Sequence, residues 1–202
     1  TLVVAILGAF VEWLKLPLGE YDIAHLAYRI EREDLLMHGG KQDQYAATFG
    51  GVNYMEFYAG DKVIVNPLRV KEKSLHELEN NLILFFTETI RLSSEIIRKQ
   101  SDNVKKKNAK SIEAMHSLKE QSVMMKEALL RGEVDKIGEI LHYGWEHKKA
   151  MAEGISNQQL ETIYNAALKA GATGGKISGA GGGGFMIFYS PYNSKYKVID
   201  AL

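Results

Sequence analysis

Residues 39–45 place a dense set of polar groups between two apolar stretches. The segment reads Gly-Gly-Lys-Gln-Asp-Gln-Tyr, and its two glycines permit backbone turns at which other residues would clash. Asp43 lies between two carboxamides, with a lysine before them and a tyrosine after. Such a carboxylate could be catalytic, or it could cap the helix that follows. These residue types alone leave the two interpretations of Asp43 equally open.

A second glycine-rich stretch covers residues 174–184, Gly-Gly-Lys-Ile-Ser-Gly-Ala-Gly-Gly-Gly-Gly, directly before an apolar strand at 185–189. It formally contains G-x-G-x-x-G, but a strand follows where a dinucleotide-binding motif requires a helix. No Gly-Lys-Ser/Thr ends the run, so it is not a Walker loop either. A flexible hairpin is one interpretation. Close approach of the backbone to another loop or to phosphates explains so many glycines better.

The remaining charged groups offer fewer candidates. The predicted helix at 21–36 ends in an acidic stretch that includes Glu31, so carboxylates approach the first glycine loop. His142 and His147 are five apart on a predicted helix, where they cannot share a metal ion. We interpret all six histidines as structural or surface groups, and Lys148 and Lys149 as solvent-exposed charges.

Composition narrows the class of protein. Of the 202 residues 46% are hydrophobic and 25% charged, and 25 basic residues balance 25 acidic ones. This neutrality argues against nucleic acid or a membrane surface as a partner. The chain has no cysteine, which excludes disulfides and allows the cytoplasmic location that we expect. The apolar run at 1–11 is too short for a membrane helix and lacks the basic start of a signal peptide.

The elements that must position these residues follow from the apolar spacing. We expect a mostly buried helix at 1–16, whose abrupt start suggests a fragment, and a short helix at 45–49. Further expected elements are strands at 53–58, 62–65, 82–87 and 185–189, and helices from 91 to about 100, from 112 to Gly132, at 137–151 and at 160–170. Asn66-Pro67 marks a boundary. The predicted fold class is α+β, with an N-terminal domain at 1–66 and a C-terminal domain of helices on an antiparallel sheet at 67–202.

Taken together, the Gly-Gly-Lys-Gln-Asp-Gln-Tyr segment and the Lys-Ile-Ser-Gly-Ala-Gly-Gly-Gly-Gly segment resemble motifs of the GHMP kinases. The resemblance covers essentially the whole chain and is strongest to the sugar-1-kinase branch. It implies the two-domain GHMP kinase fold, with the active site in the cleft between the domains. The family's nucleotide loop is absent, and the helix at 1–16 resembles the helix that follows that loop. We therefore expect this polypeptide alone to be inactive.

The resemblance implies ATP and Mg²⁺ as cofactors and transfer of the γ-phosphoryl group to the anomeric hydroxyl of D-glycero-D-manno-heptose 7-phosphate. Asp43 matches the catalytic aspartate, and Glu31 matches the glutamate that helps to hold Mg²⁺. The other implied site residues are Gly39, Gly40, Lys41 and Gln42 for the substrate, and Ser178, Gly179, Ala180, Gly181, Gly182, Gly183 and Gly184 in support of the phosphate-binding loop. Arg91, with Ser93 and Ser94 at a helix start, is a candidate for the 7-phosphate, although a simple serine cap is the alternative.

Two other functions stay open. One is a kinase for an unphosphorylated sugar such as fucose, and the other is a non-catalytic sugar-binding relative. The expected partners are the small molecules alone, with no nucleic acid and no membrane, and a homodimer is compatible with the resemblance.

Overall fold

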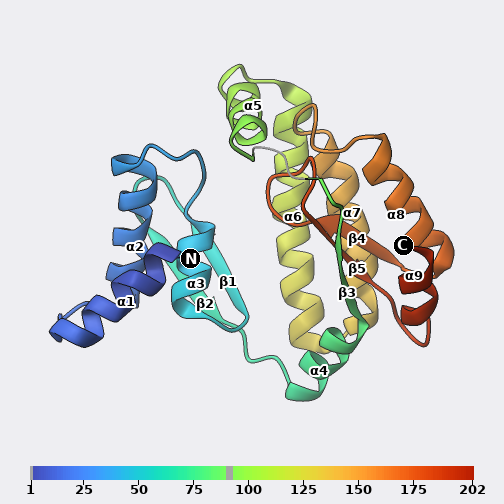
Figure 1. Cartoon of the computed structure of the whole chain (residues 1–202), viewed down its shortest axis with the longest axis horizontal. Helices are drawn as coiled ribbons and strands as arrows, with labels where there is room; N and C mark the ends of the chain where they lie inside the picture. The colour runs from blue at the N-terminus through green and yellow to red at the C-terminus, as the bar shows by residue number, and fades with distance from the viewer. Residues whose placement is uncertain (1, 90–92) are drawn as a thin grey trace. The chain divides into compact units, whose positions relative to one another are not determined.

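The computed structural model describes residues 2–89 and 93–202, with the Ser93 side chain left out. The chain divides into two compact units, residues 1–68 and 69–202. Each unit is described by itself, and Figure 1 labels their helices and strands.

The first unit packs helices beside a two-stranded antiparallel sheet. Its elements are α1 (Leu2–Leu14), α2 (Glu20–Arg29), the π-helical turn η1 (Ile30–Asp34), α3 (Gln42–Phe49), β1 (Asn53–Phe57) and β2 (Val63–Pro67). Ala24, Tyr45 and Val65 form the buried core. The Tyr21 hydroxyl accepts a hydrogen bond from the Val65 amide at 2.9 Å, so α2 is tied to β2. This small core fixes the start of α3, which carries the polar segment.

The prediction that the helix at 1–16 is mostly buried was wrong. Of the residues in α1, Val4 alone is buried, whereas Trp13 is 76% exposed and Leu2 is 73% exposed. Within the described chain α1 packs against α2 and α3. Most of the apolar side chains of α1 therefore stay exposed in this unit.

The helix expected at 45–49 begins three residues earlier, at Gln42. Asp43 therefore lies inside the first turn of α3, and Lys41 occupies the N-cap position, where no side chain makes a capping hydrogen bond. The interpretation of Asp43 as a helix cap was wrong. A carboxylate in the first turn still complements the helix dipole, but that role does not require this position or this residue.

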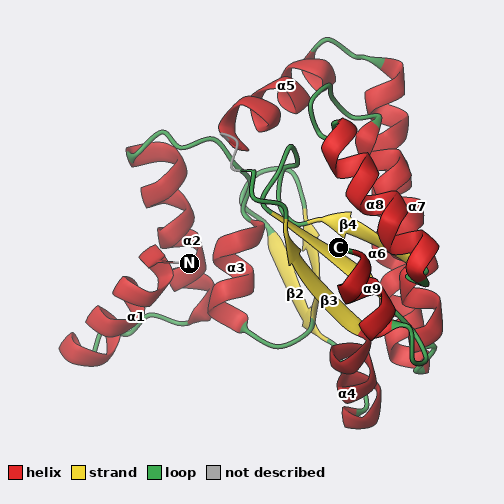
Figure 2. Cartoon of the chain, turned by 45° about the vertical axis from the view of Figure 1, so that its right-hand side comes forward, coloured by secondary structure: helices red, strands yellow, loops and turns green. Residues whose placement is uncertain are grey.

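The second unit places helices around a three-stranded antiparallel sheet of order β3-β5-β4. Its elements are α4 (Glu72–Asn81), β3 (Leu82–Phe86), α5 (Ser93–Lys105), α6 (Ala109–Arg131), η2 (Val134–Lys136), α7 (Ile137–Lys149), α8 (Gln158–Ala170), β4 (Gly174–Ile177), β5 (Phe185–Tyr189) and α9 (Lys195–Ala201). Figure 2 shows the strands against the surrounding helices. The helix and strand content confirms the α+β fold class.

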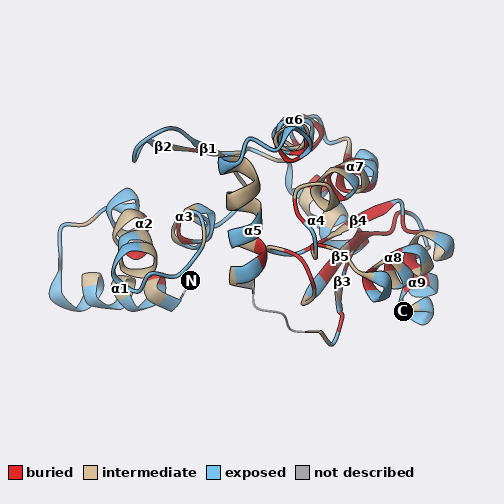
Figure 3. Ribbon diagram, turned by 90° about the horizontal axis from the view of Figure 1, so that it is seen from above, coloured by how far each residue is buried: buried red, intermediate tan, exposed pale blue. Residues whose placement is uncertain are grey.

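One face of this sheet forms the main core. Ile177, Met186 and Phe188 are fully buried there against Leu160 of α8 and Val198 of α9. Figure 3 shows buried segments on β4 and β5 and on the neighbouring helix α8. The core thus fixes β4 and β5, which flank the glycine-rich loop.

In the second unit, strand β4 and helix α5 differ most clearly from the sequence prediction. Residues 174–177 were expected within a glycine loop, but they form strand β4, paired antiparallel with β5. Glycine is required at the start of this strand, since a Cβ on Gly174 would lie 1.9 Å from the Gly138 carbonyl oxygen. The helix expected to end near Gln100 continues to Lys105. Helix ends at Gly132 and Gly171 are confirmed, and both glycines adopt the left-handed conformation.

Among the described residues, no helix combines the length and the apolar character needed to cross a lipid bilayer.

Candidate active site

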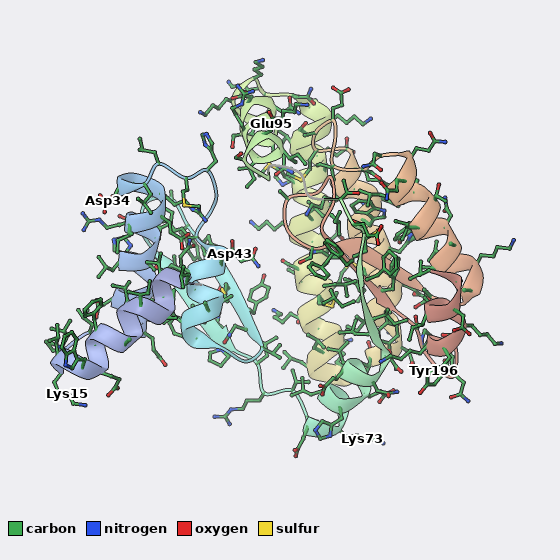
Figure 4. All side chains as sticks on the ribbon, viewed as in Figure 1. Lys15, Asp34, Asp43, Lys73, Glu95 and Tyr196 are labelled. Carbon is green, nitrogen blue, oxygen red and sulfur yellow. The ribbon has the colours of Figure 1, made fainter. Side chains whose placement is uncertain are left out.

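Asp43 is exposed at the N-terminal end of α3 (Figure 4). Its two neighbours differ in environment: Gln42 is exposed, whereas Gln44 is completely buried. The helical geometry therefore directs Gln44 into the unit and leaves the Asp43 carboxylate accessible to solvent and small molecules.

Glu31, the predicted magnesium residue, lies in η1 and is held by two neighbours. Gln44 Nε2 donates to Glu31 Oε2 at 2.5 Å, and the Arg32 guanidinium lies 3.4 Å from the same oxygen. The side chains of Glu31 and Arg32 are only 12% and 11% exposed. Because Gln44 follows Asp43 in α3, one helix turn carries the candidate catalytic carboxylate and the amide that orients the candidate metal ligand.

Arg32 was not among the predicted site residues, but it organises the first glycine loop. Its guanidinium donates to the carbonyl oxygens of Gly40 at 3.2 Å and His38 at 3.4 Å. A Cβ on Gly39 would lie 2.6 Å from Arg32 Cζ, so the missing side chain of Gly39 makes room for this contact. No spacing in the sequence indicated this role, because the contacts form only when the loop folds back onto η1.

Lys41 is already engaged within its own unit. Its ammonium donates to Asp61 Oδ1 at 2.8 Å and to the Gly60 carbonyl at 3.2 Å, and it lies 4.9 Å from the centre of the Tyr28 ring. The hydrogen bond to Asp61 raises the pKa of Lys41 and lowers that of Asp61. Lys41 thus joins the start of α3 to the β1–β2 turn, and a contact with substrate stays a prediction.

The oxygen donors near Glu31 fit a hard cation such as Mg²⁺. Gln44 Oε1 is buried without a hydrogen-bond partner among the described residues, next to the Glu31 carboxylate. In the same part of the chain, no three carboxylate or imidazole groups gather into a metal site. A cation bound mainly by phosphate oxygens and water, with a single carboxylate from the protein, is the arrangement that Mg²⁺ commonly adopts with nucleotides.

The second glycine-rich segment, residues 178–184, connects β4 to β5 and is fastened at several points. The amides of Gly182 and Gly184 donate to the carbonyl oxygens of Ile155 at 2.8 Å and Thr89 at 2.7 Å. In return the Gly184 carbonyl accepts from the Thr87 amide at 2.8 Å and from its hydroxyl at 2.9 Å. These bonds fix the loop, which is not the flexible hairpin of the alternative interpretation.

Close approach of this backbone to other segments is confirmed. A Cβ on Gly183 would lie 2.4 Å from the Thr89 carbonyl oxygen, and one on Gly181 would lie 2.9 Å from Ile155 Cα. Both glycines have positive φ, 154° and 122°. Gly179 differs, because a Cβ there would meet nothing within 4 Å, and the neighbouring Ser178 is exposed. The loop is therefore anchored on one side and open near Gly179.

The interpretation of Lys148 and Lys149 as solvent-exposed charges was wrong, since both are half-buried. Lys148 is half-buried at the end of α7, and its ammonium donates to the Gly179 carbonyl. Burial, together with repulsion from Lys176, lowers the pKa of Lys148 to about 8. Burial also lowers the pKa of Lys176. The sequence showed Lys176 as a lone cation within the glycines, but nothing in the spacing indicated that Lys148 would join it.

Arg91, the predicted residue for the 7-phosphate, lies outside the described residues. The other predicted residues fall into two groups, one in each unit: residues 31 and 39–43 in the first, and residues 178–184 in the second.

In a comparison with known proteins, the segments that contain these two groups match models of the same protein family. The family model described as GHMP kinases N terminal domain matches residues 1–51, and the model described as GHMP kinases C terminal matches residues 125–202. The chain belongs to the GHMP kinase family. Both predicted motifs thus lie within segments matched by the family.

Two similar proteins match all or nearly all of this chain, and a third matches most of it. A D-glycero-alpha-D-manno-heptose 7-phosphate kinase of Campylobacter jejuni is 52% identical over 202 residues, which are all of this chain and 59% of the relative. The chain also resembles the crystal structure of a D-glycero-D-manno-heptose 1-phosphate kinase from Bacteroides thetaiotaomicron, with 44% sequence identity and a TM-score of 0.74. This match covers 98% of the present chain and 54% of the kinase chain. A bifunctional fucokinase/GDP-fucose pyrophosphorylase of Arabidopsis thaliana is 27% identical over 161 residues, 79% of this chain and 15% of the relative. The chain thus spans about three fifths of the Campylobacter kinase.

Proposed function

We propose that the chain forms the larger part of an ATP-dependent kinase that phosphorylates the anomeric hydroxyl of D-glycero-D-manno-heptose 7-phosphate. The observation that carries the proposal is the 52% identity across the whole chain to a heptose 7-phosphate kinase. The two units, residues 1–68 and 69–202, would be the N-terminal remnant and the C-terminal domain of that enzyme. ATP and the sugar phosphate would be its small-molecule ligands.

In this proposal Asp43 accepts the proton of the sugar hydroxyl or orients that hydroxyl for attack. Its exposed position without a capping role supports this assignment. Glu31 would hold Mg²⁺, which when bound would neutralise charge on the transferred phosphoryl group. Gln44 and Arg32 keep the Glu31 carboxylate in one orientation. Phosphoryl transfer depends mainly on such positioning and charge stabilisation.

The segments around the two carboxylates would shape the substrate site. Residues 39–42 precede Asp43 directly and are held by Arg32. Gly39, Gly40, Lys41 and Gln42 are therefore our candidates for substrate contact. In the second unit, the fixed 178–184 loop is our candidate for the segment that supports the phosphate-binding loop of the enzyme.

The test uses the complete natural protein that contains these residues, as wild type and as Asp43→Asn. ATP- and Mg²⁺-dependent phosphorylation is followed with heptose 7-phosphate, and ³¹P NMR locates the new phosphate. We expect the wild type to form the 1,7-bisphosphate. The rate of this reaction should fall by about 10²- to 10⁴-fold in Asp43→Asn. The variant retains the fold if its melting temperature stays near that of the wild type.

A second candidate is a kinase for an unphosphorylated sugar such as fucose, since the Arabidopsis fucokinase is 27% identical over most of the chain. Turnover of fucose or mannose in preference to the heptose phosphate would replace the first proposal with this one. Binding of a sugar without any turnover would favour a non-catalytic relative.

A further inference from the structure

Two lysines from distant parts of the second unit meet beside the glycine-rich loop. Lys148 reaches the loop directly through its hydrogen bond to the Gly179 carbonyl. Lys176 and Gly174 lie on the same face of β4, because residues two apart along a strand share a face. That face is turned toward α7, since a Cβ on Gly174 would meet Gly138 and His142 of that helix. The Lys176 side chain therefore leaves β4 on the side of the helix that carries Lys148.

In the part of the chain that the structure describes, neither lysine is matched by a counter-charge. Among the described residues, no carboxylate forms an ion pair with Lys148 or with Lys176. The adjacent Lys149 is different, because its ammonium lies 2.7 Å from a Glu146 oxygen and 3.3 Å from a Glu161 oxygen. Two half-buried cations that repel each other are unfavourable unless an anion joins them. Such unfavourable arrangements are common where a protein binds a charged ligand.

The loop next to the lysines adds space and further donors. A Cβ on Gly179 would meet nothing within 4 Å, so the region beside this residue is open. The loop amides of Ser178, Gly182 and Gly184 are bound to carbonyl oxygens. Four other amides have no acceptor among the described residues, namely those of Gly179, Ala180, Gly181 and Gly183. An anion with several acceptor oxygens could use both the ammonium groups and backbone amides of this kind.

We propose that Lys148 and Lys176, together with the backbone of the 178–184 loop, bind a phosphate group. Its assignment to the 7-phosphate of the sugar rests on the function proposed above. A phosphate of the nucleotide has the same chemistry, and the experiments below separate the two sources. The pair would give the enzyme a means to distinguish a phosphorylated heptose from a free sugar.

The first experiment measures binding to the 202-residue chain itself. Inorganic phosphate is titrated into protein labelled with ¹³C at lysine Cε, and the variants Lys148→Met, Lys176→Met and Lys149→Met are compared. We expect phosphate to shift the Lys148 and Lys176 signals. The dissociation constant should rise roughly 10- to 100-fold in Lys148→Met and in Lys176→Met, and should stay unchanged in the control Lys149→Met. Equal effects of all three substitutions, or no shift at either lysine, would overturn the proposal.

The second experiment identifies the source of the phosphate with the complete natural protein. Lys176→Met should raise the KM for heptose 7-phosphate roughly 10- to 100-fold and leave the KM for ATP within about twofold. The KM for the unphosphorylated heptose should not change. A rise confined to the KM for ATP would assign the site to the nucleotide instead, and unchanged KM values for both substrates would overturn the proposal.

These experiments also separate this inference from the proposed function. If the wild type phosphorylates no heptose but phosphate binding still depends on Lys148 and Lys176, the function fails and the phosphate site stands. If the wild type is fully active and the lysine variants match it, the function stands and the phosphate site fails.

Discussion

Gln44 Nε2 donates a hydrogen bond to Glu31 Oε2 at 2.5 Å, and this bond joins the start of α3 to the π-helical turn η1. Gln44 directly follows Asp43, so the bond ties the candidate metal ligand to the residue next to the candidate catalytic carboxylate. Arg32 extends this connection to the carbonyl oxygens of the Gly39-Gly40 loop. A substitution at Glu31, Arg32 or Gln44 should therefore be felt at the other two.

The first prediction concerns Mg²⁺. Glu31→Gln should raise the Mg²⁺ concentration for half-maximal activity roughly 10- to 100-fold, because it removes a charged oxygen donor. The matched control is Glu33→Gln: Glu33 lies in the same turn but is 56% exposed and pairs with Arg29 at 3.3 Å. The control should leave the Mg²⁺ requirement unchanged. Magnesium titrations of activity in the complete protein give both values, and equal requirements in the two variants would contradict the assignment of Glu31.

The second prediction separates a functional Asp43 from a structural one. Asp43→Asn should lower the free energy of unfolding by about 0.5 kcal/mol or less, since only a helix-dipole interaction is lost. A true cap provides the comparison, because the Asn108 side chain accepts from the Ser111 amide at 3.0 Å. Asn108→Ala should destabilise the chain by about 1 kcal/mol. Urea unfolding measures the free energy of unfolding of both variants. If Asp43→Asn destabilises the chain as much as Asn108→Ala does, the structural interpretation of Asp43 is restored.

The third prediction tests the close contact at Gly39. In Gly39→Ala the new Cβ would lie 2.6 Å from Arg32 Cζ, so the guanidinium must give up its bonds to the loop. We expect a destabilisation of about 1–3 kcal/mol. Gly40→Ala is the control, since its Cβ would meet nothing within 4 Å. Urea unfolding of the two variants gives the comparison, and a Gly40→Ala variant as unstable as Gly39→Ala would show that the Arg32 contact is not the cause.

The fourth prediction concerns stability and pH at Lys148. The pKa of this lysine is lowered from 10.5 to about 8 in the folded protein by burial and by Lys176. Between these two values the unfolded chain binds more protons, so the stability of the wild type should increase as the pH rises from about 8 toward 10.5. Below pH 8 the full penalty of the buried cation is present. Lys148→Met should therefore stabilise the chain at pH 7 by about 1–2 kcal/mol.

Lys149→Met is the control for this effect and should have the opposite sign. It removes the ion pairs of Lys149 with Glu146 and Glu161 and its contact with the Trp145 ring. Thermal unfolding from pH 6 to 10 follows both variants. A Lys148→Met variant that is less stable than the wild type at pH 7 would show that the lysine is a structural anchor and not a strained cation.

The residue types and their spacing were sufficient to predict much of this protein. The apolar spacing predicted the α+β class and most helices and strands, because helical and strand periodicities are local properties of the chain. The glycines at 132 and 171 predicted helix ends for the same reason. The two glycine-rich segments indicated the GHMP kinase family, and the family models match the segments that contain them.

Only the tertiary structure decided which side chains meet. Gln44 is thirteen residues from Glu31 and Lys148 is 31 residues from Gly179, so no local spacing could predict these contacts. The need for glycine at position 174 in β4 also depends on a distant helix, because the Gly138 carbonyl of α7 occupies the space that a side chain on Gly174 would fill. The burial of α1 was mispredicted since an apolar helix is buried only where other elements cover it. Packing between distant segments, and not the sequence pattern, determines which of the charged side chains form ion pairs.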